Sequence, residues 1–281
     1  MQATEPSYPE HLRAEVDAYL EQLRFSEETG SAGLQEAMRY SLLAGGKRIR
    51  PVLALASAEA IGQDGATVLP LAASIELIHT YSLIHDDLPA MDNDDLRRGR
   101  PTCHRAFGED VAILAGDGLY AEAFRLLLTQ QPGEPANLLA AAAELAAATG
   151  VGGMVGGQYL DVAETAPAGP EGLRRLHELK TGRLIGASIE CVLLLWRPHE
   201  PDTIALFRSY ASELGVLFQI VDDILDVTGS PETLGKQQGS DERLGKRTYV
   251  TEFGLDGARA LAIESHHRAR FALSRAAPQG A

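Results

Sequence analysis

The chain has 281 residues, of which 45% are hydrophobic and 23% charged, so a sizeable folded core is expected. Its net charge of −14 argues against general nucleic-acid binding, which needs a basic surface, and against docking on anionic lipid. Two cysteines make no disulfide framework, which favours a cytoplasmic location. No run of about 18 apolar residues is evident, so no membrane span is expected. The polar, acidic start MQATEPSYPEHLRAEV is not expected to be a targeting peptide.

Apolar residues recur at helical spacing along most of the chain. The predicted helices are 5–25, 31–44, 51–61, 67–86, 109–130, 135–150, 172–195, 202–228 and 255–276. The breaks between them fall at glycine and proline and are short, and we find neither a separating linker nor a fixed-period repeat. We therefore predict an all-α fold in one large domain, 1–281, of about ten helices, with the most apolar helices at its centre.

The strongest chemical signal is HDDLPAMDNDD, residues 85–95, directly after an apolar helix. Carboxylates at this density repel one another by about 4 kcal/mol for a pair about 4 Å apart at an effective dielectric of about 20, and a helix C-terminus also disfavours anions. The cluster calls for a cation, and oxygen ligands select a hard ion such as Mg²⁺. Pro89 is expected to end or distort the helix, so that Asp86 and Asp92 can turn toward one site. Taken alone, this run could also be a solvated acidic loop.

A second acidic cluster, FQIVDDILDV, places Asp222, Asp223 and Asp226 in a long apolar helix. Asp222 and Asp226 are four residues apart and are expected to share one face. Charged residues on such a helix are rarely buried without partners. Two acidic clusters on two buried helices indicate one site, bridged by several Mg²⁺ ions and a diphosphate.

Basic motifs accompany the acidic ones. In GGKRIRP, residues 45–51, the glycines permit close backbone approach and Lys47 and Arg50 supply positive charge. Arg97 and Arg98 follow the first acidic cluster. The weaker basic motifs are Lys180-Thr181-Gly182, Gly235-Lys236 and Gly245-Lys246. Each basic run alone could be a solvated turn or a helix end, but beside the acidic clusters they predict a diphosphate site.

In chain order, GGKRIRP, HDDLPAMDNDDLRRGRPT, GGQYLD, KTG, FQIVDDILD and GK…GSD…GKRTY resemble the motifs of the trans-isoprenyl diphosphate synthases, most closely the bacterial farnesyl and geranylgeranyl diphosphate synthases. The resemblance implies the isoprenoid synthase fold, with helices around a central active-site cavity, and a homodimer. It implies a transferase that condenses isopentenyl diphosphate with dimethylallyl or geranyl diphosphate, head-to-tail. Up to three Mg²⁺ ions per site, with Mn²⁺ as a substitute, would assist ionisation to an allylic cation.

The resemblance also implies roles for residues of this sequence. Metal ligands are Asp86, Asp87, Asp92 and Asp222, with Asp223 and Asp226 in supporting or water-mediated roles. The allylic diphosphate contacts Arg97, Lys180, Lys236 and Lys246. The isopentenyl diphosphate pocket holds Gly46, Lys47, Arg50, His79 and Arg98. The catalytic set is Lys180, Thr181 and Gln219, whose last two members place oxygens near the developing cation. Without the resemblance, a lone His79 in an apolar helix would be interpreted as a satisfied core residue.

Product length is expected to depend on the residues one helical turn before Asp86, which are Tyr81 and Ser82. A bulky residue there would form the floor of an apolar tunnel, and the family resemblance associates an aromatic residue at this place with farnesyl-type enzymes. We therefore predict the fifteen-carbon product. A geranylgeranyl diphosphate synthase is the main alternative.

Two further alternatives are more remote. A di-iron carboxylate bundle needs two Glu-x-x-His pairs, and Glu76–His79 and Glu264–His267 have that spacing. It leaves both aspartate clusters and GGKRIRP unexplained, however. A catalytically silent synthase subunit would be expected to have damaged aspartate motifs, and both are intact. Terpene cyclases share the fold, but GGKRIRP argues for two diphosphate substrates.

Overall fold

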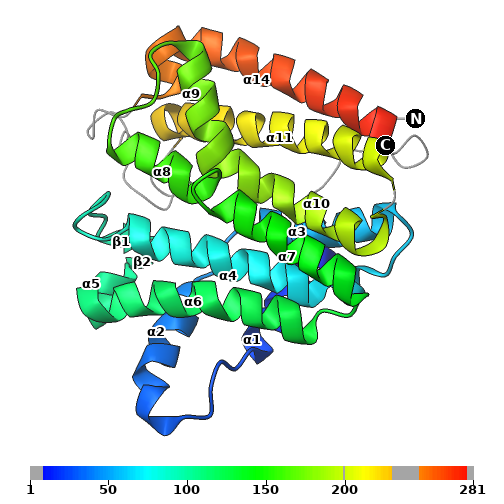
Figure 1. Cartoon of the computed structure of the whole chain (residues 1–281). Coiled ribbons are helices and arrows are strands. Elements are labelled where there is room, and N and C mark those ends of the chain that lie inside the picture. The colour runs from blue at the N-terminus through cyan, green and yellow to red at the C-terminus, as the bar shows by residue number, and fades with distance from the viewer. Residues whose placement is uncertain (1–8, 199, 230–246, 277–281) are drawn as a thin grey trace.

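The computed structural model describes residues 9–198, 200–229 and 247–276, and these are helical almost throughout (Figure 1). The α-helices are α1 (Glu10–Gln22), α2 (Ala32–Leu42), α3 (Ile49–Ala60), α4 (Leu69–Asp86), α5 (Cys103–Phe107), α6 (Glu109–Gln130), α7 (Pro135–Thr149), α8 (Met154–Val162), α9 (Pro170–His177), α10 (Arg183–Trp196), α11 (Pro201–Thr228) and α14 (Tyr249–Ala276). Short helical turns are η1 (Thr29–Ser31), η2 (Gly65–Val68) and η3 (Glu178–Gly182). The predicted all-α fold is confirmed.

The strands β1 (Leu96–Arg97) and β2 (Arg100–Pro101) form a two-residue antiparallel hairpin in the loop after α4. Four helices, α4, α7, α9 and α11, begin with proline in the first turn, where its missing N–H costs nothing. Proline therefore fixes several of the boundaries that the sequence indicated.

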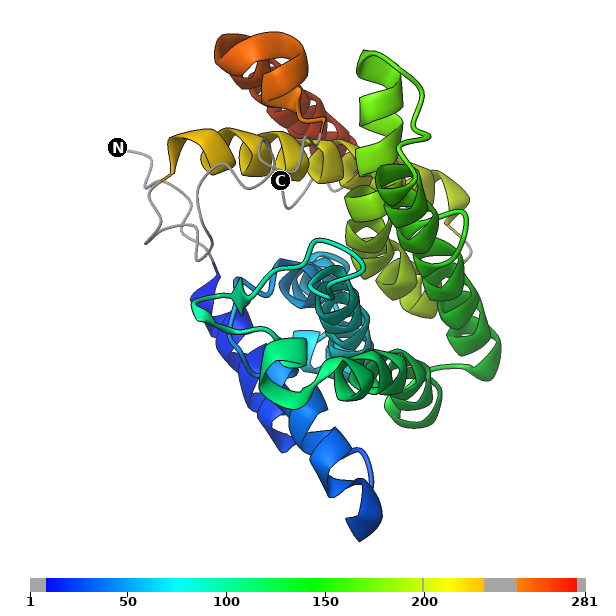
Figure 2. The same ribbon diagram turned by 90° about the vertical axis from the view of Figure 1, so that its left-hand side faces the viewer.

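Helix α4 lies at the centre of the bundle, as its apolar sequence predicted. Every residue from Pro70 to Ile78 is buried, including Glu76. Helices α3, α6 and α10 pack against α4, with α1 and α2 on another side, and Figure 2 shows this ring of helices in the turned view. Because α4 is fixed on all sides, its C-terminal end is a rigid support for the acidic cluster that follows.

The structure differs from the predicted helices in three places. Helix α8 was not predicted; its Gly157 packs tightly against Lys180 of η3. The predicted helix 172–195 is α9 and α10, joined by the π-helical turn η3. The predicted helix 255–276 is part of a longer element that starts at Tyr249 and is interrupted at Gly254, whose φ is 69°.

Three helical stretches are long and apolar enough to cross a membrane, judged by length and composition only: Gly65–Asp86, Pro135–Val162 and Pro201–Thr228. This finding differs from the expectation that no segment has this property. In the first stretch 67% of the apolar window is buried inside the bundle, so packing against other helices explains its composition. The corresponding shares are 39% and 33% in the other two.

Candidate active site

The first acidic motif begins where α4 ends, at Asp86. The backbone then turns back on itself, and the N–H of Asp92 donates to the carbonyl of Asp86 at 2.9 Å. The expected termination of the helix near Pro89 is therefore confirmed. The turn places Asp86 and Asp92 next to each other in space although they are six residues apart in sequence.

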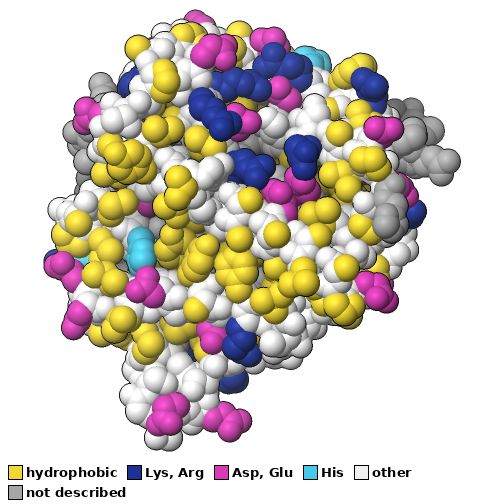
Figure 3. All heavy atoms as spheres, in the orientation of Figure 1, with side chains coloured by type: hydrophobic (Ala, Val, Ile, Leu, Met, Phe, Trp, Pro, Cys, Tyr) yellow, Lys and Arg dark blue, Asp and Glu magenta, His cyan; other side chains and the backbone are white. Residues whose placement is uncertain are grey.

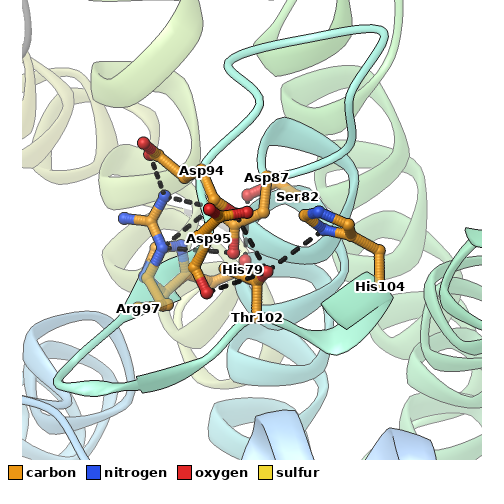
Figure 4. A network of polar contacts seen from close by, with 8 residues as sticks. All are labelled: His79, Ser82, Asp87, Asp94, Asp95, Arg97, Thr102 and His104. Atoms are coloured by element: carbon orange, nitrogen blue, oxygen red, sulfur yellow. Dashed lines mark hydrogen bonds and ion pairs between the residues drawn. The ribbon is translucent and has the colours of Figure 1, made fainter. Parts of the chain in front are cut away.

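Asp87 is buried and paired with Arg97. The Nε atom of Arg97 lies 3.0 Å from one carboxylate oxygen and 3.3 Å from the other, and Nη2 contacts the first oxygen as well. Figure 4 shows the same guanidinium reaching Asp94, at 3.6 Å. Burial raises the pKa of the Asp87 carboxyl, and the hydrogen bond from Arg97 offsets part of that rise. In this structure Asp87 therefore orients an arginine predicted to bind diphosphate.

The β1–β2 hairpin brings Arg98 to the GGKRIRP loop. Arg98 itself has a φ of 54°, and its guanidinium donates to the carbonyl of Gly45. Gly46 has a φ of 130°, which favours glycine, and an added Cβ would lie 2.7 Å from Cζ of Arg98, so any other residue would also displace this guanidinium. Arg98 thus connects two loops whose contacting residues are 53 positions apart in the sequence.

A dense cationic pocket forms around His79. Burial lowers the pKa of His79 well below its usual value, and Arg50, Arg98, Arg97 and Arg48 lower it further. Burial also lowers the pKa of Arg50 to about 10; Glu76 opposes this change and Arg98 adds to it. The Nε atom of Arg50 is buried and has no hydrogen-bond partner. Arg50 as a whole is partly exposed, and a guanidinium with a buried, unused donor beside further positive charges is suited to bind an anion.

The second acidic motif lies in the last turns of α11. Asp222 and Asp226 lie four residues apart in this helix, as expected, but they differ in exposure. Asp222 is exposed, whereas Asp223 and Asp226 are only 2% and 3% exposed. Asp223 accepts a hydrogen bond from Nε2 of Gln219 at 2.8 Å and another from the backbone N–H of Tyr249 at 2.7 Å. Asp223 therefore fixes the start of α14.

The KTG motif lies in the π-helical turn η3. Lys180 forms an ion pair with Asp161 of α8 at 2.6 Å. The hydroxyl of Thr181 donates to Oε1 of Gln219 at 3.3 Å, so the predicted catalytic pair Thr181 and Gln219 is brought together and linked to Asp223. A Cβ added to Gly157 would lie 2.3 Å from the backbone nitrogen of Lys180, which explains the glycines of GGQYLD.

The sequence interpretation missed several residues that this geometry uses. Asp161 closes the GGQYLD motif, but the motif alone does not indicate its ion pair with Lys180. Likewise, nothing in GGKRIRP or in the helix that carries Glu76 indicates the buried ion pair of Arg48 with Glu76. Lys47 is exposed. Lys236 and Lys246 lie outside the described residues.

The structure argues against the di-iron alternative. Glu76 is ion-paired with Arg48 at 2.6 Å, with both side chains 2% exposed, and Glu264 is paired with Arg268 at 2.9 Å. Across residues 9–198, 200–229 and 247–276, no three histidine, cysteine or acidic side chains are gathered as a metal site, which holds for the two Glu-x-x-His pairs and equally for the two aspartate motifs. The two Glu-x-x-His pairs are therefore not assembled around a common centre.

A buried histidine behind the KTG motif makes stability depend on pH. His177 is 6% exposed, stacks on Tyr249 with ring centroids 5.4 Å apart, and has no hydrogen-bond partner at either ring nitrogen. Burial lowers the pKa of His177 to about 4. The positive charges of Lys180 and Arg247 also lower this pKa, whereas the carboxylate of Asp161 raises it. The neutral imidazole is thus favoured by folding. Its contribution is complete above the unfolded pKa near 6.5 and is lost as pH falls toward 4.

His177→Phe keeps the stacked ring but does not titrate. Between pH 7 and pH 5 the free energy of unfolding of the wild-type protein should fall relative to that of the variant by about 2 kcal/mol, since one pKa unit corresponds to about 1.4 kcal/mol. Urea unfolding of both proteins at the two pH values measures this difference. An identical pH dependence of the two proteins would contradict the assignment.

The all-α fold and the cations beside an acidic helix end suit an enzyme that handles diphosphate esters. Comparison with known proteins agrees with this. Residues 31–272 match the family model "Polyprenyl synthetase". The chain is 46% identical to a farnesyl diphosphate synthase of Geobacillus stearothermophilus over 259 residues, covering 90% of this chain and 85% of that protein. The chain belongs to the polyprenyl synthetase family and is a prenyltransferase.

Relatives with another product are similarly close. A chloroplastic geranylgeranyl pyrophosphate synthase of Arabidopsis thaliana is 46% identical over 256 residues, covering 87% of this chain and 71% of that protein. Among solved structures, a Helicobacter pylori geranyltransferase complexed with magnesium and isoprenyl diphosphate has a TM-score of 0.88 and 32% identity, covering 99% of this chain and 94% of that one. Family membership therefore settles the reaction class and leaves product length to the site itself.

Proposed function

We propose that the protein is a Mg²⁺-dependent farnesyl diphosphate synthase that condenses isopentenyl diphosphate with dimethylallyl or geranyl diphosphate. The observation that carries the proposal is the buried Nε of Arg50, which has no hydrogen-bond partner and interacts electrostatically with Arg98 and with the neutral His79. A pocket of this kind is costly unless an anion enters it. His79 lies on α4, the helix that ends at the first acidic motif, so a diphosphate bound beside it would be held close to the proposed metal-binding end of α4.

The side chains fit a hard divalent cation. Their donors are carboxylate oxygens, the ligands that Mg²⁺ prefers, and the turn after α4 brings Asp86 and Asp92 together. With the exposed Asp222 these residues would hold the ions, as many as three, and Mn²⁺ would serve as a substitute. Asp223 and Asp226 are buried and would support the site from behind. When bound, the metal stabilises the negative charge of a departing diphosphate.

The chain's own residues divide the remaining work. Arg97, oriented by Asp87, and Lys180, oriented by Asp161, would hold the allylic diphosphate while its C–O bond breaks. We propose this orienting role for Asp87 in place of direct metal ligation. Thr181 and Gln219 would direct oxygens toward the positive charge that develops on the allylic carbon. Lys236 and Lys246, outside the described residues, are proposed to add to the allylic diphosphate site.

The second diphosphate would be bound by the GGKRIRP loop with α4 and the hairpin. Arg50, Arg98 and neutral His79 would donate to its oxygens, Lys47 would approach from the exposed side, and Gly46 would leave the space that Arg98 needs. The double bond of this substrate then attacks the allylic carbon, and the new carbon–carbon bond forms as a proton leaves toward the released diphosphate. Two diphosphate sites distinguish this proposal from a terpene cyclase.

The fifteen-carbon product is proposed from the aromatic cluster below the first acidic motif. Tyr81 of α4 packs edge-to-face against Tyr120 of α6 at 5.2 Å and against His85 at 5.0 Å, and Phe124 extends the cluster beyond Tyr120. The hydroxyl of Ser82 is bonded to the carbonyl of His79 in its own helix. This cluster would form the floor of the substrate tunnel, and Tyr81 would be its bulkiest member on α4. A geranylgeranyl product remains the second candidate, because synthases of that name are similar to the chain.

We propose that the protein is a homodimer with its interface over α6, α7 and α8. These elements expose large apolar side chains, and Figure 3 shows such residues gathered across that face. They include Leu114 at 55%, Leu128 at 47%, Leu139 at 66% and Tyr159 at 66% exposure, and Val151, in the loop between α7 and α8, is 87% exposed. An exposed apolar face of this extent is typical of an association surface.

Both cysteines are free and buried, which suits the proposed cytoplasmic location.

The dimer proposal predicts that Leu139→Glu weakens self-association at least about tenfold, since it places an unpaired charge in an apolar interface. Light scattering after size exclusion measures the change across a concentration series. Ile263→Glu is the matched control, because Ile263 is also an exposed apolar residue, at 61%, but lies on α14. A wild-type monomer, or equal effects of the two substitutions, would reject the interface.

The proposed function is tested by incubating the purified protein with labelled isopentenyl diphosphate, dimethylallyl diphosphate and Mg²⁺, with and without excess chelator. Label should enter a fifteen-carbon diphosphate only when metal is available. A twenty-carbon main product would replace the farnesyl assignment with the second candidate. No incorporation under any condition would indicate a catalytically silent subunit.

A further inference from the structure

Arg48 is the most deeply buried cation in the GGKRIRP loop. Its side chain is 2% exposed and makes three polar contacts: Nη1 with Glu76 at 2.6 Å, Nε with Asp17 at 2.9 Å, and Nη2 with the carbonyl of Leu42 at 2.8 Å. These contacts join α1, the end of α2 and the middle of α4. Each nitrogen of the Arg48 guanidinium therefore has an acceptor within the protein, whereas the buried Nε of Arg50 has none.

The backbone at Arg48 shows the same fixation. Its φ of 51° and ψ of 37° lie in the left-handed region, which is uncommon for a residue other than glycine, asparagine or aspartate. Arg48 is the residue directly before α3, so this conformation sets the direction in which the helix starts. Lys47, on one side of it, is exposed, and Arg50, on the other, lies in the first turn of α3 with its Nε buried and unpaired. A strained conformation of this kind persists only where the surroundings hold it.

Glu76, the partner of Arg48, also acts on the rest of the pocket. It lies three residues before His79 on α4, hence almost one helical turn away on the same side. Its carboxylate raises the pKa of Arg50, against the effect of burial, and acts in the same direction on Arg98. Glu76 is therefore a buried counter-ion for several of the cations around His79, and its salt bridge to Arg48 links the loop to the helix that carries this histidine.

We propose that Arg48 is a positioning residue that, through its buried contacts with Glu76, Asp17 and the carbonyl of Leu42, locks the GGKRIRP loop so that Arg50, Arg98 and His79 converge on the diphosphate of isopentenyl diphosphate. The inference rests on the proposed function, because it assigns a supporting element to one of its two substrate sites. It concerns only that site: the residues proposed for the allylic diphosphate, Arg97 and Lys180, are oriented by Asp87 and Asp161 instead. Arg48 should therefore affect the two substrates unequally.

The test compares steady-state kinetics of Arg48→Lys with wild-type enzyme, varying each substrate in turn at a saturating level of the other. Lysine retains the charge but cannot make the three divergent contacts of a guanidinium. We expect KM for isopentenyl diphosphate to rise about tenfold, because a misplaced loop would lose about one charge-assisted hydrogen bond to this substrate. KM for geranyl diphosphate should change less than about twofold. Glu76→Gln should give the same asymmetry.

The matched control is Glu190→Gln, which breaks another pair of a buried carboxylate with an arginine, Glu190 with Arg208, away from both substrate sites. It should lower thermal stability without separating the two KM values. If Arg48→Lys does not fold, Asp17→Asn decides the matter, because Asp17 is half-exposed and its loss is milder; KM for isopentenyl diphosphate should then rise about threefold.

A parallel change of both KM values and kcat in a folded Arg48→Lys or Asp17→Asn protein would overturn the proposal and leave Arg48 a purely structural residue. An unchanged KM for isopentenyl diphosphate would overturn it as well. The failure of the proposed function would look different, since wild-type enzyme itself would then form no product from the two diphosphates.

Discussion

Asp86→Ala and Asp222→Ala are each expected to lower the rate of product formation by about a thousandfold or more. Each substitution removes a carboxylate from one of the two acidic motifs that we propose hold Mg²⁺, and electrostatic stabilisation of a departing diphosphate is of this size. Asp86 is the last residue of α4, and Asp222 is exposed on α11, so neither carboxylate is needed to fill the core. Single-turnover assays with geranyl and isopentenyl diphosphates measure the effect on chemistry directly.

Asp117→Ala is the control for these variants. Asp117 lies on α6 near the end of α4, with its carboxylate 4.0 Å from His85, and its side chain is 64% exposed. It contributes negative charge close to the same helix end but belongs to neither acidic motif, so its loss should change the rate less than about threefold. Wild-type activity of a folded Asp86→Ala protein, or equal losses in Asp86→Ala and Asp117→Ala, would refute the metal assignment.

Tyr81→Ala is expected to shift the main product from farnesyl to geranylgeranyl diphosphate. The substitution removes an aromatic ring that packs against Tyr120 and His85, and it opens space one turn below Asp86 for another five-carbon unit. The rate of the first condensation should change little, because Tyr81 has no proposed contact with either diphosphate. Chromatography of the dephosphorylated products gives the chain-length distribution.

Tyr81→Phe tests whether bulk is the relevant property. It keeps the ring and its edge-to-face packing while removing the hydroxyl, so the fifteen-carbon product should persist. Ser82→Ala should also leave product length unchanged, since the Ser82 hydroxyl is bonded within α4. A fifteen-carbon product from a folded and active Tyr81→Ala enzyme would show that the floor lies elsewhere.

Most of the helices could be predicted because apolar periodicity and proline report directly on local structure. The central place of α4 followed from its apolar sequence, and the turn after Asp86 followed from Pro89. Helix α8 was missed because glycine is a poor helix former, yet the close contact of Gly157 with Lys180 selects glycine there. The boundary between α9 and α10 was missed because a π-helical turn keeps an apolar pattern almost continuous.

The candidate site shows a similar limit. The sequence motifs identified residues by chemical type, but the pairing of those residues depends on contacts between distant segments. Asp87 carries the same functional group as Asp86, and only its burial against Arg97 shows that it has a partner within the protein. Asp223 was expected to support the metal site, and its hydrogen bond to the N–H of Tyr249 was not predictable, because it joins the second motif to a helix that starts 26 residues later.

The central claim is that one site joins two diphosphate substrates with release of one diphosphate. The most direct measurement is a single-turnover reaction of enzyme, Mg²⁺, geranyl diphosphate and labelled isopentenyl diphosphate, with farnesyl diphosphate and inorganic diphosphate quantified in the same sample. The account predicts equal amounts of both products and neither in the presence of excess chelator. Inorganic diphosphate released without labelled farnesyl diphosphate, or condensation that continues in excess chelator, would contradict it.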